Sequence, residues 1–325
     1  MSIQKICIVG AGNLSTRRIY PLLGQAGAQL VGVCDLDAEK AKRNATLWGG
    51  NVYSDMERML DTEKPDGVII CISADMHARL APLALKKGIP VYTEKPPAET
   101  AAAALEVAKI AKQTGVLCTN AFKKRYNVAY NRAKEWLSKF PESDRYSMSV
   151  DYASKQYENN SLRRLFLFDF TIHIIDLTQY LFGDASRVFA FAKGPDAYAV
   201  SIQFASGAVG SLNLTDGRSF NVPTEEVELT VKGGNFMTIH NSSVYRITEN
   251  EKPVEWREPP TFTSAGDSGN DTGHLAELAD FLAAIREKRT TRSNIYESYK
   301  SMVLYEAIKN SAETGRVVEI GYEKI

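Results

Sequence analysis

Short apolar runs alternate with longer helical patterns over residues 3–120 of the chain. The runs are KICIVG, QLVGVCD, GVIICIS, PVYTEK and VLCTNA, and segments such as DAEKAKRNATLWG and AETAAAALEVAKIAKQTG separate them. Strands that alternate with helices are typical of a parallel, doubly wound sheet. The pattern therefore predicts a doubly wound α/β domain over residues 1–121.

Glycine and proline indicate where helices end or bend in this domain. Gly27, Gly49, Gly88 and Gly115 each follow a helical pattern, where glycine commonly ends a helix. Pro21 falls inside the first helical segment, where it removes a backbone donor. We therefore expect the first helix to be bent.

After Phe122 the pattern changes to that of a second domain. A helical stretch over 126–140, a strand over 145–153 and an apolar helical segment precede a series of strand-like runs that continues to residue 258. In VELTVKG apolar and polar residues alternate, and Ser206-Gly207 and Gly233-Gly234 mark turns. A loop rich in Gly, Ser, Thr and Asp (263–273) precedes HLAELADFLAAIREK and a last helix near 298–314. Residues 122–325 are thus predicted to form an α+β domain with a large, mostly antiparallel sheet.

The stretch IVGAGNLS places Gly10 and Gly12 between the first strand and the first helix. Glycine there lets the backbone turn tightly and approach a pyrophosphate, whose charge the helix N-terminal amides bind. Ser15 replaces the third glycine of G-x-G-x-x-G, so an ordinary strand-to-helix turn is the alternative.

The second strand ends at Asp35, near the place, roughly 20 residues on, where dinucleotide-binding domains carry a ribose-binding carboxylate. That spacing favours dinucleotide binding. A carboxylate repels a 2'-phosphate and Leu36 supplies no cation, so we expect NAD rather than NADP. Arg17 and Arg18 keep NADP as an alternative, although they also fit a solvated helix face.

The run PVYTEK ends in Glu94-Lys95-Pro96-Pro97, at the carboxyl edge of the predicted parallel sheet. Doubly wound domains bind their ligands at this edge. Two prolines restrict the backbone after Lys95, which suits a cation aimed at a fixed point. The alternative is a surface lysine before a helix that begins with proline.

The stretch FDFTIHIIDL carries Asp169, His173 and Asp176 in an otherwise apolar segment. In a regular helix the three would share one face, and the surrounding residues are too apolar for a surface helix. Buried carboxylates need partners or a wet cavity. General-base chemistry at His173, a structural network in which His173 bridges the two acids, and a metal site all remain open, the last with the least support.

Composition limits the class of protein. A chain of 325 residues with 44% hydrophobic residues holds enough apolar material for two domains. Zero formal net charge without a basic block argues against nucleic acid and against a polybasic membrane contact. The start of the chain does not resemble a secretory leader, and no uncharged apolar run reaches membrane length, so we expect a cytoplasmic protein.

Cysteines and histidines do not indicate a metal site. The cysteines lie in or beside short β-branched runs, without the spacing of a zinc site or of a disulfide framework; they are Cys7, Cys34, Cys71 and Cys118. No two of the four histidines share metal-ligand spacing.

Together these motifs resemble the Gfo/Idh/MocA oxidoreductases, the glucose-fructose oxidoreductase and inositol dehydrogenase group. The resemblance covers essentially the whole chain through IVGAGN, Asp35, KPDGVIICISADMHARLAPLALKKGIPVYTEKPPA, NAFKKRYN, DFTIHIIDLTQYLFG and GHLAELADF. Two departures stand out: Ser15, and NNSLRRLFLF in place of the glycine-rich stretch that commonly precedes the D-x-x-x-H helix.

The resemblance implies an α/β protein with an N-terminal Rossmann domain (1–121) and a C-terminal α+β domain (122–325) whose open, mostly antiparallel sheet pairs subunits into homodimers or homotetramers. It implies an NAD-dependent dehydrogenase of a sugar, polyol or sugar derivative, with Lys95, Asp169 and His173 as its catalytic residues. An enzyme that recycles bound NAD within one turnover, such as a glycosidase or a sugar–sugar oxidoreductase, and a non-catalytic NAD-binding regulator are the alternatives.

Further site residues are expected around this catalytic set. Residues expected to contact the cofactor are Gly10, Gly12, Asn13, Leu14, Asp35, Ser73, Glu94 and Lys95. Residues expected near the substrate are His77, Asn120, Lys123, Arg125, Tyr126, Arg163, Arg164 and Asp176. Arg163 or Arg164 would grip a phosphate or carboxylate of the substrate, unless both are ordinary surface arginines.

Overall fold

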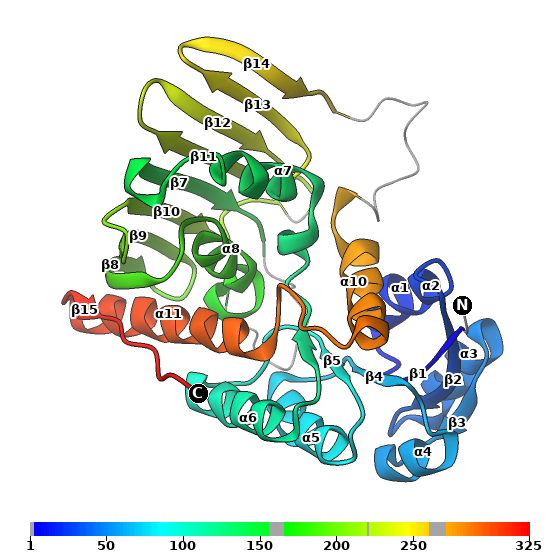
Figure 1. Cartoon of the computed structure of the whole chain (residues 1–325). Helices are drawn as coiled ribbons and strands as arrows, with labels where there is room; N and C mark the ends of the chain where they lie inside the picture. The colour runs from blue at the N-terminus through cyan, green and yellow to red at the C-terminus, as the bar shows by residue number, and fades with distance from the viewer. Residues whose placement is uncertain (1–2, 156–165, 220, 260–270) are drawn as a thin grey trace. The chain divides into compact units, whose positions relative to one another are not determined.

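The computed structural model describes residues 3–155, 166–219, 221–259 and 271–325, which form two compact units (Figure 1). Unit 1 comprises Met1–Lys123, His274–Tyr299 and Ile325, and unit 2 comprises Lys124–Gly273 and Lys300–Lys324. The chain therefore leaves the first unit close to the boundary expected from the sequence. It then returns to that unit with residues 274–299, which the change of pattern after Phe122 does not indicate.

The described part of unit 1 contains a six-stranded parallel sheet in the order β3-β2-β1-β4-β5-β6. Its strands are β1 (Gln4–Val9), β2 (Ala28–Cys34), β3 (Asn51–Tyr53), β4 (Gly67–Ile70), β5 (Val91–Thr93) and β6 (Cys118–Asn120). The predicted doubly wound sheet is confirmed. The pattern missed β3 because this strand has only three residues and its Val52 is 44% exposed, so it has no apolar run.

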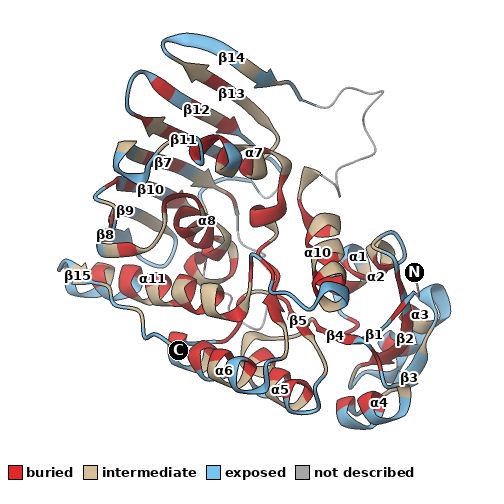
Figure 2. Ribbon diagram, in the orientation of Figure 1, coloured by how far each residue is buried: buried red, intermediate tan, exposed pale blue. Residues whose placement is uncertain are grey.

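Helices cover both faces of this sheet. One face packs against α4 (Met56–Glu63), α5 (Ala74–Lys86) and α6 (Ala101–Thr114), and the other against α1 (Asn13–Arg18), α2 (Tyr20–Leu23), α3 (Ala38–Trp48) and α10 (His274–Glu287). In β1, Cys7 and Val9 belong to the first core and Ile6 and Ile8 to the second, as successive side chains of a strand must alternate. The interior strands are buried on both sides (Figure 2).

The bend expected in the first helix is confirmed as a break. Helix α1 ends at Arg18, and α2 begins at Tyr20 with Pro21 in its first turn. Proline lacks the N–H that would continue the α1 hydrogen-bond ladder, but it is tolerated where a new helix starts. The glycine expected at the end of α6, Gly115, adopts a left-handed φ of 67°.

Unit 2 is built on a sheet of nine described strands in the order β14-β13-β12-β11-β7-β10-β9-β8-β15. The strands are β7 (Arg145–Ala153), β8 (Ala185–Lys193), β9 (Ala197–Phe204), β10 (Val209–Thr215), β11 (Thr224–Val231), β12 (Asn235–His240), β13 (Val244–Glu249), β14 (Lys252–Arg257) and β15 (Val318–Glu319). Neighbours pair antiparallel except β7 with β10. The mostly antiparallel sheet predicted for the second domain is confirmed.

Helices cover one face of this second sheet. The helical segments are η1 (Lys123–Tyr126), α7 (Val128–Leu137), η2 (Glu142–Asp144), η3 (Phe166–Phe170), α8 (Ile172–Phe182) and α11 (Ile295–Thr314), of which α7, α8 and the later part of α11 lie along the sheet (Figure 1). In β7, Met148 and Val150 are buried whereas Ser149 and Asp151 are exposed. This alternation leaves one face of the sheet open to solvent in the single chain (Figure 2).

Candidate functional site

The turn after β1 requires a glycine at its first position. Gly10 has a φ of 104°, and a Cβ on this residue would lie 2.1 Å from the carbonyl oxygen of Cys71. Strands β1 and β4 are the neighbours at which the strand order reverses, where doubly wound sheets bind ligands at the carboxyl edge. A close backbone approach thus forms at the predicted phosphate turn.

The rest of the turn lacks the third glycine of the motif, but α1 still begins directly after Gly12. Gly12 is the N-cap of α1, and a Cβ there would meet no heavy atom within 4 Å. Ser15, at the place of the third glycine, is buried and its Oγ donates to the Gly12 carbonyl at 3.1 Å. Asn13 and Leu14 are exposed beside the turn, where a ligand can reach them.

Asp35 is bonded to the same turn. Its Oδ2 accepts from the Ala11 N–H at 2.6 Å and its Oδ1 from the Asp37 N–H at 2.8 Å. The carboxylate therefore stands at the end of β2, beside the glycine turn, as the spacing predicts. The next side chain, Leu36, is 93% exposed and brings no positive charge.

The segment after β5 holds the predicted lysine. Lys95 is partly buried, Glu94 is 6% exposed, and the Lys95 N–H donates to Glu94 Oε2 at 3.2 Å. The Lys95–Pro96 peptide is cis, and Pro96 and Pro97 are both buried. Lys95 consequently lies at the carboxyl edge of the sheet, on a backbone that two prolines restrict.

Two residues expected near the substrate are buried in unit 1 and bonded to neighbouring loops and strands. His77 is 1% exposed; its Nδ1 lies 2.9 Å from the Pro96 carbonyl oxygen, and its Nε2 lies 3.2 Å from the Ile72 amide nitrogen. Asn120 is also 1% exposed, and its amide donates to Thr93 Oγ1. Ser73, expected at the cofactor, is partly buried at the N-cap of α5.

A buried hydrogen bond between Tyr92 of β5 and Glu277 of α10 was not predicted from the sequence. The Tyr92 hydroxyl donates to Glu277 Oε1 at 2.8 Å, and Glu277 is 1% exposed. Burial, together with nearby Glu94, raises the pKa of Glu277 well above its ordinary value. Burial therefore favours the protonated form of Glu277. The only available signal was a glutamate on the apolar face of the GHLAELADF helix.

His274, one turn earlier on α10, is neutral for a similar reason. Burial first, then the cations Lys123 and Arg18, lower the pKa of His274 to about 2. Lys123, expected near the substrate, is thus close enough to α10 to influence the titration of a buried histidine within unit 1.

In unit 2 the predicted stripe is divided by a change of helix type. Asp169 lies in the π-helical turn η3, and the Thr171 N–H bonds back five residues to the Phe166 carbonyl at 3.1 Å. His173 lies in the first turn of α8 and is partly exposed, whereas Asp169 is 6% exposed. The three residues therefore do not follow one regular α-helix.

Asp176, the last residue of the stripe, has an internal ion pair. Its two oxygens accept from Arg125 Nε at 2.9 Å and Nη2 at 2.8 Å, and Oδ1 also accepts from Ser301 Oγ at 2.8 Å. The Arg125 and Asp176 side chains are 2% and 1% exposed, and the guanidinium stacks 5.1 Å from the Tyr180 ring. Asp176 is thus part of a buried network with Arg125 and Ser301.

The remaining predicted substrate residues fall in two groups. Tyr126 is 3% exposed, in the 3-10 helix beside Arg125. Arg163 and Arg164 lie outside the residues that the structure describes, as does most of the 263–273 loop.

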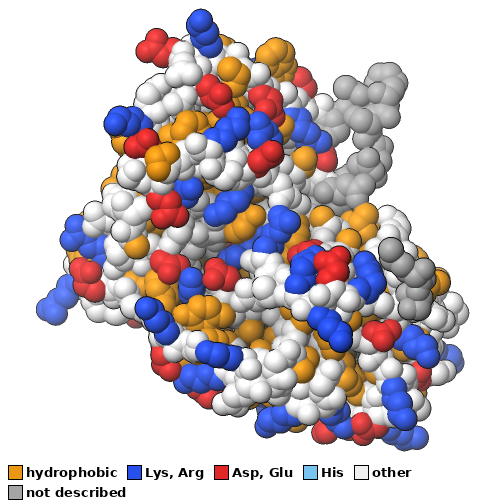
Figure 3. All heavy atoms as spheres, viewed as in Figure 1, with side chains coloured by type: hydrophobic (Ala, Val, Ile, Leu, Met, Phe, Trp, Pro, Cys, Tyr) orange, Lys and Arg blue, Asp and Glu red, His pale blue; other side chains and the backbone are white. Residues whose placement is uncertain are grey.

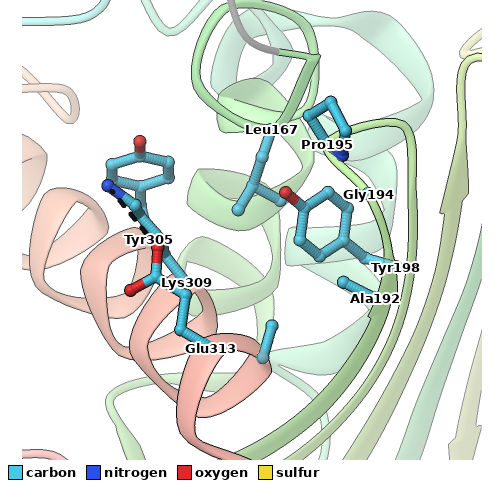
Figure 4. A pocket seen from close by; sticks show the side chains of 9 residues that line it. Leu167, Ala192, Gly194, Pro195, Tyr198, Tyr305, Lys309 and Glu313 are labelled. Carbon is cyan, nitrogen blue, oxygen red and sulfur yellow. Dashed lines mark ion pairs between the residues drawn. The ribbon is translucent and has the colours of Figure 1, made fainter.

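Unit 2 also contains a cavity of about 370 Å³ between α11 and the β8–β9 hairpin (Figure 4). The Tyr198 ring faces Leu167 and Pro195, and Lys309 pairs with Glu313 at 3.9 Å on the α11 side. The remaining lining residues are Ala192, Gly194, Tyr305 and Ala312. None of the residues predicted from the sequence lines this cavity.

Charges are mixed over the surface. Lys and Arg side chains alternate with Asp and Glu over the visible face, without a large field of one sign (Figure 3). In the described ranges, no three His, Cys, Asp or Glu side chains are grouped to hold a metal ion. None of the described helices has the length and apolarity needed to cross a membrane.

Two family profiles match the chain. Residues 4–122 match the NAD-binding Rossmann fold of the Gfo/Idh/MocA oxidoreductase family, and residues 157–320 match the C-terminal alpha/beta domain of the same family. The resemblance drawn from the motifs is confirmed.

Named relatives extend over nearly the full length. D-apiose dehydrogenase of Paraburkholderia graminis is 24% identical over 97% of this chain and 89% of its own. D-glucoside 3-dehydrogenase of Escherichia coli is 22% identical over 97% of both chains. A levoglucosan dehydrogenase solved with NADH and levoglucosan shares the fold, with a TM-score of 0.86 and 20% identity over 98% of this chain and 100% of its own.

Replacing Arg125 by Met should destabilise the protein strongly, because Asp176 would remain buried without its cation. Loss of one partner of a buried pair costs about 3–5 kcal/mol. Urea denaturation would measure this loss. Arg289→Met, which removes exposed ion pairs with Asp280 and Glu287, should cost at most about 1 kcal/mol. Equal effects of the two substitutions would contradict the structural assignment of Arg125.

Replacing Glu277 by Gln should change how stability depends on pH. A raised pKa means that the folded state holds the proton more tightly than the unfolded state. Above the unfolded pKa of about 4.3, wild-type stability therefore falls as pH rises toward the folded pKa. Gln cannot lose a proton, so the variant should gain stability relative to wild type as pH increases. Denaturation at several pH values, with exposed Glu99→Gln as control, would measure the difference; parallel curves would refute it.

Proposed function

Because the chain belongs to the Gfo/Idh/MocA family of oxidoreductases, we propose that it transfers a hydride between a nicotinamide cofactor and a secondary alcohol of a carbohydrate. The observation that carries the proposal is the pairing, within unit 1, of the Gly10 turn with Lys95 on the same carboxyl edge of the sheet. Fold alone does not determine chemistry, so the proposal depends on these residues.

The residues of unit 1 fit a dinucleotide. Gly10 lets the turn pack directly against the Cys71 carbonyl, the space beside Gly12 is open, and the exposed Asn13 and Leu14 border the same turn. A pyrophosphate could therefore approach the backbone amides of this turn. Asp35 would accept hydrogen bonds from a ribose and repel a 2'-phosphate, which favours NAD over NADP. When bound, the nicotinamide accepts or donates the hydride.

Three side chains would act on the substrate. In the oxidative direction His173 would take the hydroxyl proton, because a neutral imidazole can accept a proton from a hydroxyl group. Asp169, four residues earlier, would orient the imidazole and stabilise its charged form. The Lys95 ammonium would stabilise the negative charge that develops on the substrate oxygen.

The substrate class follows from the relatives rather than from a motif. The named relatives act, by their names, on D-apiose, D-glucosides and levoglucosan, all of them carbohydrates with secondary hydroxyl groups. We therefore propose a sugar, polyol or sugar derivative for this chain. Pocket shape and a few polar contacts decide between such substrates.

We also propose that the open face of the unit 2 sheet joins copies of this chain into a homodimer or homotetramer. Exposed apolar side chains on the sheet strands include Phe191, Val209, Phe236 and Trp256, which are 68%, 51%, 38% and 62% exposed. Apolar surface of this kind marks an interaction site. A cytoplasmic location stays part of the proposal, in keeping with four cysteines that form no disulfide.

The catalytic proposal predicts that Lys95→Met and His173→Ala each lower kcat by at least about 10²-fold, since each removes charge stabilisation or proton transfer. The Kd for NAD should change less than about threefold, because these groups act on the substrate. The assay follows reduced cofactor by absorbance with polyols, free sugars, sugar phosphates and uronates as substrates. Lys109→Met, on the surface of α6, is the matched control and should leave turnover unchanged.

The same assay separates the alternatives. Turnover without release of NADH would indicate an enzyme that recycles its cofactor, and NAD binding without any turnover would favour a regulator. Full activity of both variants would refute the assigned roles of Lys95 and His173.

The assembly proposal predicts that Trp256→Glu shifts the protein toward monomers, because a charge would be buried in an apolar interface. Light scattering after gel filtration would measure the mass. Leu47→Glu is the control, since Leu47 is 64% exposed on α3 of unit 1 and is not part of the unit 2 sheet. A wild-type protein that is already monomeric would exclude the assembly.

A further inference from the structure

His77 connects two loops at the carboxyl edge of the unit 1 sheet. One loop follows β4, where the Ile72 amide nitrogen lies 3.2 Å from His77 Nε2. The other follows β5, where the Pro96 carbonyl oxygen lies 2.9 Å from Nδ1. The imidazole is 1% exposed, so these contacts are shielded from water.

The two partners select one form of the ring. A backbone amide can only donate, so Nε2 must accept and carries no proton. A carbonyl oxygen can only accept, so Nδ1 carries the proton of a neutral imidazole. The Ile72 N–H therefore donates to Nε2, and Nδ1–H donates to Pro96. A cationic ring would lose the first of these bonds.

The loop after β4 is itself joined to the predicted phosphate turn. The Cys71 N–H donates to the Val9 carbonyl at 2.8 Å, and the Cys71 carbonyl oxygen lies 2.1 Å from where a Gly10 Cβ would be. A continuous series of contacts thus runs from Gly10 through Cys71 and Ile72 to His77, and from His77 to the residue that follows Lys95.

Packing alone does not account for an imidazole here. The other buried residues of α5 are Ala81, Ala84 and Leu85, all apolar. Burial removes water from the His77 ring, and its two backbone bonds offset part of that cost. Both bonds connect His77 to the loops after β4 and β5, not to other residues of α5.

We propose that His77 is a positioning residue. It holds the Lys95–Pro96 segment at a fixed place relative to the predicted phosphate turn at Gly10 and so directs the Lys95 ammonium. This inference rests on the function proposed above for Lys95. Lysine has a long, flexible side chain, so its reach is determined by where its backbone is anchored. A misplacement of about 1 Å at a reacting group can cost about 10²-fold in rate.

The test is a double-mutant cycle with Lys95. His77→Ala should lower kcat by about 10–10²-fold while the Kd for NAD, measured by titration without substrate, changes less than about threefold. In the Lys95→Met background, His77→Ala should change the remaining turnover by less than about twofold, because a positioning residue has no effect once its target is absent.

His77→Asn is the rescue variant. The Asn amide can take the place of Nδ1–H and donate to Pro96, although it cannot reach Ile72. It should recover at least about tenfold of the kcat that His77→Ala loses. Its melting temperature shows whether the fold is intact. If the Ala variant does not fold, His77→Asn is compared with wild type, and a kcat within about tenfold of wild type is expected, with the Kd for NAD unchanged.

Each outcome decides a separate question. If Lys95→Met retains full turnover, the proposed function of Lys95 fails. If Lys95→Met loses turnover but His77→Ala has the same effect in both backgrounds, only the positioning role of His77 is overturned. Equal losses of NAD affinity and kcat in His77→Ala and His77→Asn would likewise reduce His77 to a structural residue.

Discussion

The contact on which the site in unit 1 depends is the approach of two backbones at the reversal point of its sheet. Gly10 comes so near to the Cys71 carbonyl that no other side chain fits. This contact aligns the turn after β1 with the loop after β4, and the ladder continues to β5 because the Glu94 N–H donates to the Ile70 carbonyl at 2.9 Å. Cofactor and substrate chemistry can share an edge because neighbouring parallel strands end there together.

Buried polar side chains also hold the carboxyl edge of the unit 1 sheet in place. His77 bonds to two loops, and Glu277 accepts a hydrogen bond from Tyr92. Each of these side chains costs free energy to bury. The hydrogen bonds of His77 to Ile72 and Pro96, and of Glu277 to Tyr92, offset part of that cost. The late return of residues 274–299 to unit 1 is needed for this arrangement, because α10 supplies Glu277 and His274.

In unit 2 a buried carboxylate, Asp176, is stabilised by an ion pair with Arg125. The bidentate bond of Arg125 to Asp176 holds η1 against α8, and Ser301 adds a third donor from α11. The helix that carries His173 is thereby attached at its centre, while Asp169 lies in a π-helical turn before it. π-helical turns frequently occur at functional sites, and here the turn separates Asp169 from the regular periodicity of α8. Asp176 of this stripe therefore belongs to a buried ion-pair network, whereas the proposed function concerns Asp169 and His173.

Patterns within short stretches of the chain were enough to predict the two fold classes, the irregular first helix at Pro21, the glycine turn, and the positions of Asp35 and Lys95 at strand ends. These features depend on local periodicity and on conformational limits that a few adjacent residues impose. The partners of the buried polar residues could be identified only once the chain was folded in three dimensions. Arg125 and Asp176 are 51 positions apart, and Tyr92 and Glu277 are 185 apart. A hydrogen bond acts between atoms near in space, and no local pattern records which distant segment will supply the second atom.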